Sequence, residues 1–349
     1  MIAYSASQAI SPAIDRTKRF LFQRFRFWTF FKLALVAALT DGGGSSFGGN
    51  IPSGSHPQSH SFLHSYSGGP LSASDFGVLV ILPAVLLGLA LMLWIWYLLV
   101  RLRFAYFHCV LYGTRRIRDG WRPYAGAAMR MFQLYLAAAA CVLVGFAALL
   151  VPCFFVFRGA FGAGAQPDVG AIVLVIAVAI PVVLALVFLS IAFEIITHDF
   201  MLPHMALENA TVGEAWRISL ASYKAEKGPF WLYGLLRVVL TIAGGIAALL
   251  ALLIPGLVVA LVVVAIFVGL NAALANASSA VHTVLLATEI VLAVVGAALG
   301  ITAGICLGGS VATWKRQYAL LFYGGRYRVL GDLLSPPSPP ALPEMPVVV

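Results

Sequence analysis

Charged side chains are scarce in this 349-residue sequence: they make up 10% of it, whereas apolar residues make up 61%. A soluble domain is about one quarter charged and about half apolar. The shortage of charge therefore excludes an ordinary soluble domain and indicates an integral membrane protein. Cysteine is scarce as well, and the four cysteines show no CxxC spacing. We expect neither a disulfide framework nor a cysteine-based metal site.

Motifs that carry catalysis are also missing. The sequence has no HExxH, P-loop or dinucleotide fingerprint. Residues 44–48 match the nucleophile-elbow string, but a glycine-rich segment supplies neither the strand nor the helix that this elbow needs. His56, His60 and His64 are spaced by four, but their Gly, Ser and Pro neighbours favour a flexible loop over a metal site. We therefore expect no enzymatic activity, no cofactor and no bound metal.

Long apolar runs are abundant. A transmembrane helix needs about 20 mostly apolar residues, because its backbone amides must be bonded within the segment. Runs of this length cover residues 76–100, 131–157, 170–196, 230–254 and 284–309. Two further segments are ambiguous. Residues 27–40 are short for a span, and residues 256–274 follow Pro255 so closely that they form either a sixth long span or a re-entrant hairpin.

The distribution of the net charge of +9 helps to decide between these topologies. Blocks of Lys and Arg flank the runs at residues 16–32, 101–130, 217–227 and 315–328, whereas residues 41–75 contain none. Short basic loops stay cytoplasmic, so we expect all four blocks on one side of the membrane. This charge pattern points to anionic lipid headgroups as a partner and not to nucleic acid.

Placing the basic blocks together requires residues 27–40 to cross the membrane and residues 256–274 to re-enter or lie in the outer interface. The sequence then predicts an all-α, polytopic transmembrane helical bundle of about six spans, with both termini cytoplasmic, in a bacterial inner membrane. Hydropathy alone favours seven spans and an external tail.

The expected organisation has three parts. A basic cytoplasmic segment covers residues 1–26, a helical membrane domain covers residues 27–333, and a proline-rich disordered tail covers residues 334–349. Within the membrane domain, residues 42–74 are rich in Gly, Ser and His and should form a flexible loop.

Two stretches of the membrane domain resemble each other. Phe104, His108, Trp121 and residues 132–135 recur as Phe200, His204, Trp216 and residues 230–233. We interpret this as a parallel internal repeat, with units of about 76–157 and 170–254 related by an axis along the membrane normal. The alternative is that aromatic and basic residues simply gather at any cytoplasmic interface.

An interfacial helix is predicted in each copy. Thr211 and Glu214 fit a capping box, and the apolar residues that follow recur at helical spacing. In the first copy Pro123 should make the helix shorter or kinked. The tryptophans expected to anchor the chain at headgroup depth are Trp28, Trp121, Trp216 and Trp231.

Three ionisable residues lie within apolar runs, where a charge is costly and therefore a functional candidate: Glu194, Arg237 and Glu289. Glu194 and Arg237 are at similar depth from the cytoplasmic end, which suggests an ion pair between neighbouring spans; separate snorkelling of each side chain is the alternative. Glu289 has no evident partner.

A glycine ridge marks the last apolar run. Gly296, Gly300, Gly304 and Gly308 follow each other at i, i+4 spacing, which lets another backbone approach one face of the helix. The ridge predicts close helix packing within one molecule or, as the alternative, the seam of a homo-oligomer or a pore-lining contact.

Several short motifs resemble a family of uncharacterised bacterial polytopic membrane proteins. They are Arg103-Phe104, Trp121, Asp199-Phe200 with Pro203 and Met205, Ala215-Trp216, and Tyr318-x-Leu320-x-x-Tyr323-Gly324. The chain departs from the pattern at Leu102, His108 and Pro123. A more distant resemblance is to the membrane domain attached to some glycerophosphodiester phosphodiesterases, whose catalytic domain is missing here. The resemblance implies a multi-pass membrane fold and no established activity.

These observations favour a non-enzymatic integral membrane protein of membrane or envelope organisation. The alternative is a small-solute or ion transporter or channel-like protein, favoured by the duplication and the intramembrane charges. A polar cavity at mid-membrane would favour transport, whereas a dry glycine seam would favour assembly.

Overall fold

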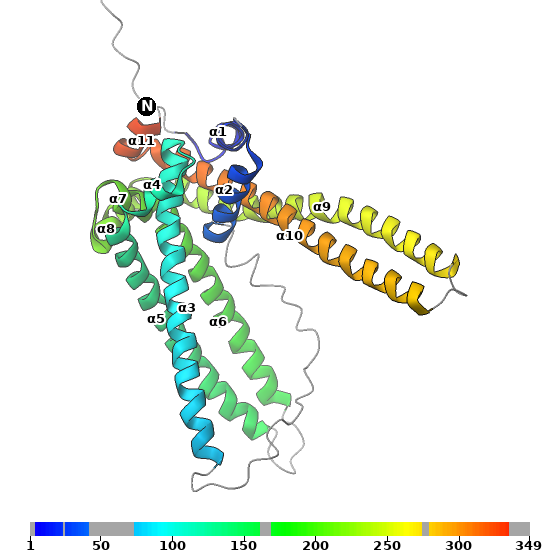
Figure 1. The fold of residues 1–349 in the computed structure, drawn as a ribbon. Coiled ribbons are helices and arrows are strands. Elements are labelled where there is room, and N and C mark those ends of the chain that lie inside the picture. Colours follow the sequence, from blue (N-terminus) through cyan, green and yellow to red (C-terminus); the bar gives the residue numbers. More distant parts are fainter. Residues whose placement is uncertain (1–3, 24, 42–72, 161–168, 274–278, 335–349) are drawn as a thin grey trace, which may run out of the picture.

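A computed structural model describes residues 4–23, 25–41, 73–160, 169–273 and 279–334, and every regular element in these ranges is a helix (Figure 1). The elements are α1 (Ile10–Phe22), α2 (Phe27–Thr40), α3 (Ala73–Tyr112), α4 (Ile117–Trp121), α5 (Ala125–Ala160), α6 (Val169–Ile195), the π-helix η1 (Ile196–Met201), α7 (Leu202–Leu207), α8 (Val212–Ala225), α9 (Lys227–Ala273), α10 (Ser279–Gly324) and α11 (Arg328–Leu334).

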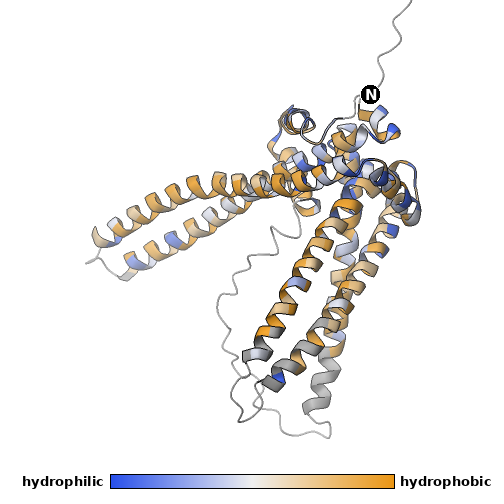
Figure 2. Cartoon of the chain, turned by 180° about the vertical axis from the view of Figure 1, so that it is seen from behind, coloured by the Kyte–Doolittle hydropathy of each residue, from blue (hydrophilic) through white to orange (hydrophobic). Residues whose placement is uncertain are grey.

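The helices form two arms that meet at one end (Figure 1). One arm contains α3, α5 and α6, and the other is a hairpin of α9 and α10. The short helices α1, α2, α4, α7, α8 and α11, together with η1, gather where the long helices converge. We call this region the hub. Apolar residues dominate both arms, whereas hydrophilic residues concentrate at the hub (Figure 2).

Within the described residues, five helices are long and apolar enough to cross a membrane. They cover Leu82–Tyr112, Ala125–Ala148, Val175–Leu207, Lys227–Ala273 and Ala280–Gly324. In each of them at most 6% of the most apolar 18-residue window is buried inside the protein. Lipid can therefore cover most of the arm surface, as expected for a multi-pass membrane protein.

The expectation of six or seven spans is corrected to five candidates by two findings. The helix α2 has only 14 residues, and at its end Asp41 lies inside the hub, within 3.3 Å of His198. Residues 256–273 neither re-enter nor form a separate span, because α9 continues through Pro255 to Ala273. Proline is tolerated in a transmembrane helix where the freed carbonyl finds another partner, so Pro255 did not mark an end. The repeat unit predicted to end at residue 254 thus ends inside a helix.

The hub contains most of the protein's core. Its fully buried rings are Phe104, Tyr106, Phe107, Tyr233, Tyr318, Phe322 and Tyr323. The ring of Tyr233 is stacked against both Tyr318 and Phe322, with centroid distances of 5.2 and 4.3 Å. The 40 residues of α3 extend about 60 Å, twice the thickness of the hydrocarbon layer of about 30 Å. A long helix can therefore cross the layer and still end in the hub.

The N-terminal segment, expected to be a separate basic region at residues 1–26, is part of the hub where it is described. Ala9, just before α1, and Ala13 on α1 are buried, and the Tyr318 hydroxyl donates to the carbonyl of Ala6. The helix α2 packs even more closely on α10, because a Cβ atom added at Gly309 would collide with the backbone of Ala34. These contacts attach the start of the chain to its last long helix.

Helices are present in the hub at both positions where interfacial helices were predicted. The Thr211 side chain accepts from the Glu214 amide and the Glu214 side chain accepts from the Thr211 amide, which confirms the capping box that starts α8. In the first copy the helix α4 has only five residues, as Pro123 predicts. The helix α8 ends at Ala225, and Gly228 and Pro229 lie in the first turn of α9.

Candidate functional site

Five ionisable side chains from four elements meet in the interior of the hub: Asp41 after α2, His198 and Asp199 on η1, Arg237 on α9 and Arg316 on α10. We call this set the charge cluster. The side chains of His198, Asp199 and Arg316 are at most 2% exposed. Ionisable residues at such depth are costly unless paired, so this cluster is the first candidate for a functional site.

Asp199 occupies the centre of the charge cluster. One of its oxygens, Oδ2, lies 2.9 Å from Nε of Arg237 and accepts a hydrogen bond of 2.7 Å from the Tyr233 hydroxyl. The other oxygen, Oδ1, is 3.9 Å from the Arg316 guanidinium and has no hydrogen-bond partner among the described residues. Tyr233 and Arg237 are four residues apart on α9, so both side chains project from one face of the helix toward the same carboxylate.

The predicted ion pair between Glu194 and Arg237 is wrong. Arg237 pairs with Asp199, and its NH1 also donates to the carbonyl of Lys315 at 3.1 Å. Glu194 is exposed on α6. Similar depth made the pairing feasible, but depth along a helix does not determine direction around it. The π-helical turn that follows Glu194 contains an extra residue, so it changes the direction around the helix in which Asp199 projects relative to Glu194.

The π-helix η1 provides a backbone ligand to the charge cluster. NH1 of Arg316 donates to the carbonyl of His198 at 2.8 Å. Next to it, the hydroxyl of Thr197 donates to the carbonyl of Phe193 at 2.8 Å and receives a bond of 3.2 Å from the Tyr135 hydroxyl. Single π-turns inside helices are rare and frequently lie at functional sites.

The end of α2 points its carbonyl groups at cations. Nε of Arg103 donates to the carbonyl of Thr40 at 3.0 Å, and Nζ of Lys315 donates to that of Asp41 at 3.2 Å. Cations at a helix C-terminus compensate its partial negative charge. Burial alone would raise the pKa of the Asp41 carboxyl, but Arg316 and His198 outweigh it and hold this pKa well below its ordinary value. Asp41 is therefore a permanent anion of the charge cluster.

Several polar atoms of the charge cluster have no hydrogen-bond partner among the described residues, and the gap beside Arg237 is small. Within the described part of the chain, Nε2 of His198 and two nitrogens of Arg316 have no hydrogen-bond partner. The gap beside Arg237, between α9 and α10, has no room for a water molecule. The Arg316 guanidinium lies 5.4 Å above the Phe107 ring, which supplies a cation–π contact in place of solvent. This geometry ties four elements together around a gap that has no room for water beside Arg237.

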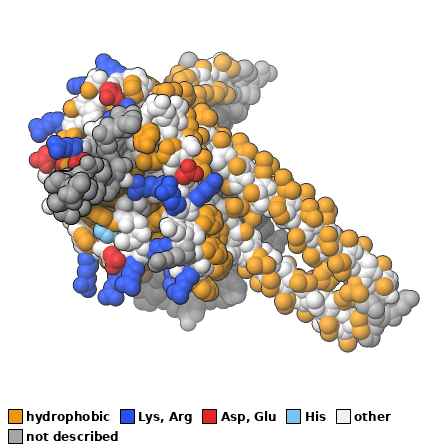
Figure 3. Space-filling view, turned by 90° about the horizontal axis from the view of Figure 1, so that it is seen from above, with side chains coloured by type: hydrophobic (Ala, Val, Ile, Leu, Met, Phe, Trp, Pro, Cys, Tyr) orange, Lys and Arg blue, Asp and Glu red, His pale blue; other side chains and the backbone are white. Residues whose placement is uncertain are grey.

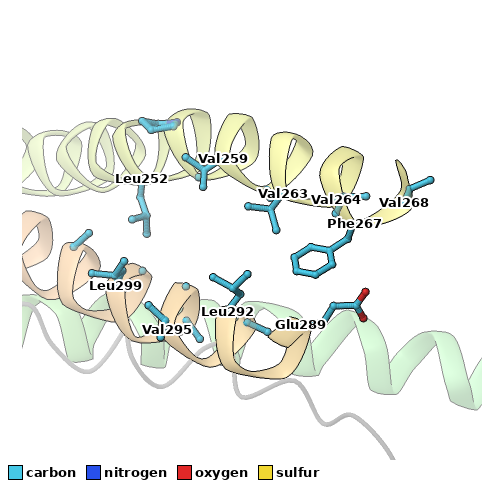
Figure 4. A pocket seen from close by; sticks show the side chains of 18 of the residues that line it. Leu252, Val259, Val263, Val264, Phe267, Val268, Glu289, Leu292, Val295 and Leu299 are labelled. Carbon is cyan, nitrogen blue, oxygen red and sulfur yellow. The ribbon is translucent and has the colours of Figure 1, made fainter. Parts of the chain in front are cut away.

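A groove of about 960 Å³ forms a second candidate site, between α9 and α10 of the hairpin (Figure 4). Side chains such as Leu252, Val263 and Leu292 line it, with Phe267 near its outer end. At that end Asn271 donates a hydrogen bond of 3.1 Å to Glu289, which identifies a partner for the carboxylate that appeared to have none. The groove is otherwise apolar and suits a hydrophobic occupant.

The glycine ridge on α10 lies along this groove. Gly296 and Gly300 line it, and a Cβ added at either glycine would meet no atom within 4 Å. A Cβ at Gly304 would meet only Leu252, at 3.8 Å, and Gly308 is open as well. The ridge therefore leaves α9 and α10 apart and does not bring them into close contact. Gly309 of α10, which the ridge pattern did not include, is instead packed tightly against the backbone of α2.

Comparison with known protein families assigns this chain to one of them. The model of a family of unknown function, DUF7544, matches residues 4–333, nearly the whole sequence. The chain belongs to the DUF7544 family. No curated protein and no solved structure matches it. Membership of an uncharacterised family is thus confirmed, whereas nothing links the chain to the membrane domains of glycerophosphodiester phosphodiesterases.

The motifs that carried the family resemblance meet in the hub of this DUF7544 member. Phe104 and Phe200 are buried there, and so are Tyr318 and Tyr323 from α10. The Tyr323 hydroxyl lies 2.7 Å from Nε2 of His204. Asp199, which opens one of the motifs, belongs to the charge cluster itself. Short motifs separated by over 200 residues therefore describe one three-dimensional region.

The predicted tryptophan anchors differ in exposure. Trp28, Trp216 and Trp231 are 70%, 42% and 60% exposed, which leaves them available for a headgroup layer. Trp121 is less exposed, because the Arg101 guanidinium covers its ring at 4.6 Å. Their placement in an interface remains a prediction.

Metal ligands do not converge in this DUF7544 protein within the described residues, which contain no group of three His, Cys, Asp or Glu side chains able to hold an ion. The histidines at positions 56, 60 and 64, the glycine-rich string at 44–48 and the tail from residue 335 lie outside the described ranges.

Sequence reasoning missed Asp41 and Arg316 as members of the charge cluster. Asp41 directly follows the apolar residues 27–40, and this position by itself indicates only the end of that segment. Arg316 lies in a basic block that was used only to assign topology. The spacing of Tyr233 and Arg237 by four was the available signal, since two polar groups on one face of an apolar helix indicate a shared buried partner.

Proposed function

We propose that this DUF7544 protein is a non-enzymatic integral membrane protein that organises the membrane or envelope by self-association through the α9–α10 hairpin. The groove lined by Gly296 and Gly300 carries this proposal. It is apolar, long and open, and the glycines leave room for another backbone. No buried residue occurs in the most apolar window of α9, so this helix needs lipid or another protein along its length.

The charge cluster acts in this proposal as a static lock at the base of the hairpin. Arg237 and Arg316 fix α9 and α10 to the same carboxylate of η1. Removal of one partner would leave a buried charge uncompensated, so the lock tolerates little movement. A rigid base would allow the hairpin to present a constant groove to a second copy.

Topology follows from the basic side chains on the hub, which gather on the face seen in Figure 3. By the positive-inside rule we place the hub on the cytoplasmic side of a bacterial inner membrane, with both termini there. Five candidate spans are an odd number, so placing both termini on one side requires one crossing beyond these five.

Transport of a small solute or ion is the second candidate, and a repeated contact favours it. Arg103 and Asp199 each precede the Phe of their repeat, and Tyr135 and Tyr233 are the corresponding tyrosines. The Arg103 guanidinium lies 5.6 Å from the Tyr135 ring, and Asp199 accepts from the Tyr233 hydroxyl. Equivalent contacts at equivalent positions support a duplication, which is common among transporters. The charge cluster argues against transport, because the gap beside Arg237 has no room for water.

Subunit counting by single-molecule photobleaching in lipid nanodiscs or native membranes tests self-association. We expect the wild-type protein to give two or more bleaching steps and Gly300→Val to shift the distribution to one step, because the new side chain fills the groove. Gly269→Val is the matched control, since Gly269 lies on the same hairpin, is equally open and does not line the groove. A single step for the wild type, or equal behaviour of both variants, would reject the proposal.

A further inference from the structure

A second cavity lies at the hub, on the side of α1. It has a volume of about 460 Å³ and is lined by Arg16, Arg19, Phe20, Gln23, Gly113, Arg115 and Gln317. We call it the basic pocket. Its walls come from α1, from the turn after α3 and from α10, so it exists only when the N-terminal helix is packed on the hub. The volume lies within the range of small-molecule sites, about 300–1,000 Å³.

Positive charge dominates the basic pocket. It contains three guanidinium groups, and its lining includes no carboxylate. Among the ion pairs of the described residues, none involves Arg16 or Arg19. Burial and the nearby Arg19 both lower the pKa of Arg16, which means that the positive charge is poorly compensated at this position. An anion would relieve this cost.

Backbone contacts hold two of these guanidinium groups in place. NH2 of Arg16 donates to the carbonyl of Leu111 at 3.4 Å. NH2 of Arg115 donates to the carbonyl of Phe20 at 3.1 Å and also to that of Gln23. A guanidinium carries five N–H donors, so Arg16 retains donors that can bind oxygen in a fixed geometry. Preorganised arginines of this kind suit planar or tetrahedral oxyanions.

Gln317 supplies an independent indication of a ligand. Its side chain is fully buried and lines the basic pocket, and within the described residues neither its amide nitrogen nor its amide oxygen has a hydrogen-bond partner. An unpaired buried amide is costly unless a ligand or water completes it. The amide can donate to an anionic oxygen and accept from a hydroxyl group, a combination that a phosphate monoester or diester with an alcohol group would satisfy.

We propose that the basic pocket binds a phosphate group, either that of an anionic lipid headgroup or that of a soluble phosphate compound. The geometry is independent of the groove on the hairpin, since the two sites share no residue. The inference thus adds a ligand to the proposed self-association and does not depend on it.

Binding to the full-length protein in a neutral detergent tests the proposal with two probes. Inorganic phosphate is titrated by calorimetry, and retention of phosphatidylglycerol against phosphatidylcholine is measured by native mass spectrometry. We expect Arg19→Gln to weaken binding of the preferred probe about tenfold, the effect of losing one charge-assisted hydrogen bond. Lys18→Gln is the control, because it removes one charge from the same helix at a residue that does not line the basic pocket.

The two sources give different results. A soluble anion predicts saturable phosphate binding that is sensitive to Arg19→Gln, whereas a headgroup predicts sensitive retention of phosphatidylglycerol without binding of inorganic phosphate. Gln317→Met removes the amide but keeps the volume, and it should weaken the same probe while an unchanged elution profile shows that the chain is folded. Equal effects of Arg19→Gln and Lys18→Gln, or failure of both probes to bind, would overturn the proposal. Subunit counts should not change in these variants.

Discussion

Asp199 illustrates how one buried carboxylate can organise a membrane protein. A single oxygen receives the Tyr233 hydroxyl and faces Arg237, both within 3 Å, while Arg316 approaches the other oxygen. The three charges come from three different helices. The stability of the hub therefore depends on the Asp199 carboxylate more strongly than the small size of this side chain would suggest. Removing one partner from a buried ionic group typically costs about 3–5 kcal/mol.

Replacement of Asp199 tests this assignment. We expect Asp199→Asn to lower the free energy of unfolding in detergent by about 3 kcal/mol, because two buried guanidinium groups lose their common counter-charge. Glu194→Gln, five residues earlier on the exposed surface, should change it by less than about 0.5 kcal/mol. Chemical unfolding followed by tryptophan fluorescence measures both. Equal losses would mean that Arg237 uses Glu194 as its partner after all.

At the scale of elements, the contact between α2 and α10 explains why a helix too short to span is still well placed. Gly309 permits the close approach of the Ala34 backbone, and cations from α3 and α10 bind the last carbonyls of α2. The close packing of Ala34 on Gly309 thus holds the middle of α2, and hydrogen bonds from two cations hold its end.

Neighbouring glycines provide a matched test of this contact. We expect Gly309→Ala to destabilise the protein by about 1–3 kcal/mol, since the added methyl group collides with a backbone that cannot move alone. Gly308→Ala meets open space and should be neutral or stabilising by up to about 1 kcal/mol, because alanine favours a helix. Thermal unfolding in detergent distinguishes them, and a Gly309→Ala protein as stable as Gly308→Ala would show that α2 does not pack there.

Local signals in the sequence were enough for some elements and not for others. The capping box at Thr211 and the short helix before Pro123 were predicted, because each depends on residues a few positions apart. The π-turn at Ile196–Met201 and the continuity of α9 through Pro255 were not, since both are decided by packing. For the same reason the regular spacing of the glycine ridge was visible in the sequence, whereas the need of α2 for Gly309 depends on packing and was not.

On the scale of the whole molecule, the two arms and the hub follow from the separation of long apolar segments from charged and aromatic segments in the sequence. Apolar residues fill the arms and expose their side chains, while charged and aromatic residues gather where the helices converge (Figure 2). The presence of the five arm helices was predictable from hydropathy, whereas their ends and the continuity of α9 through Pro255 were not. The direction of the hairpin relative to the other arm was not, because it is set by the charge cluster and by α2.

The most direct test of this account is the side from which each end of the arms can be labelled. Cysteines introduced into a cysteine-free protein at positions 118, 224 and 328 report on the hub, and those at 158 and 280 report on the far ends of the two arms. In oriented vesicles, we expect an impermeant thiol reagent to label the three hub positions from the cytoplasmic side and the two arm positions from the opposite side. Labelling of hub positions from opposite sides, or of 158 and 280 from different sides, would contradict it.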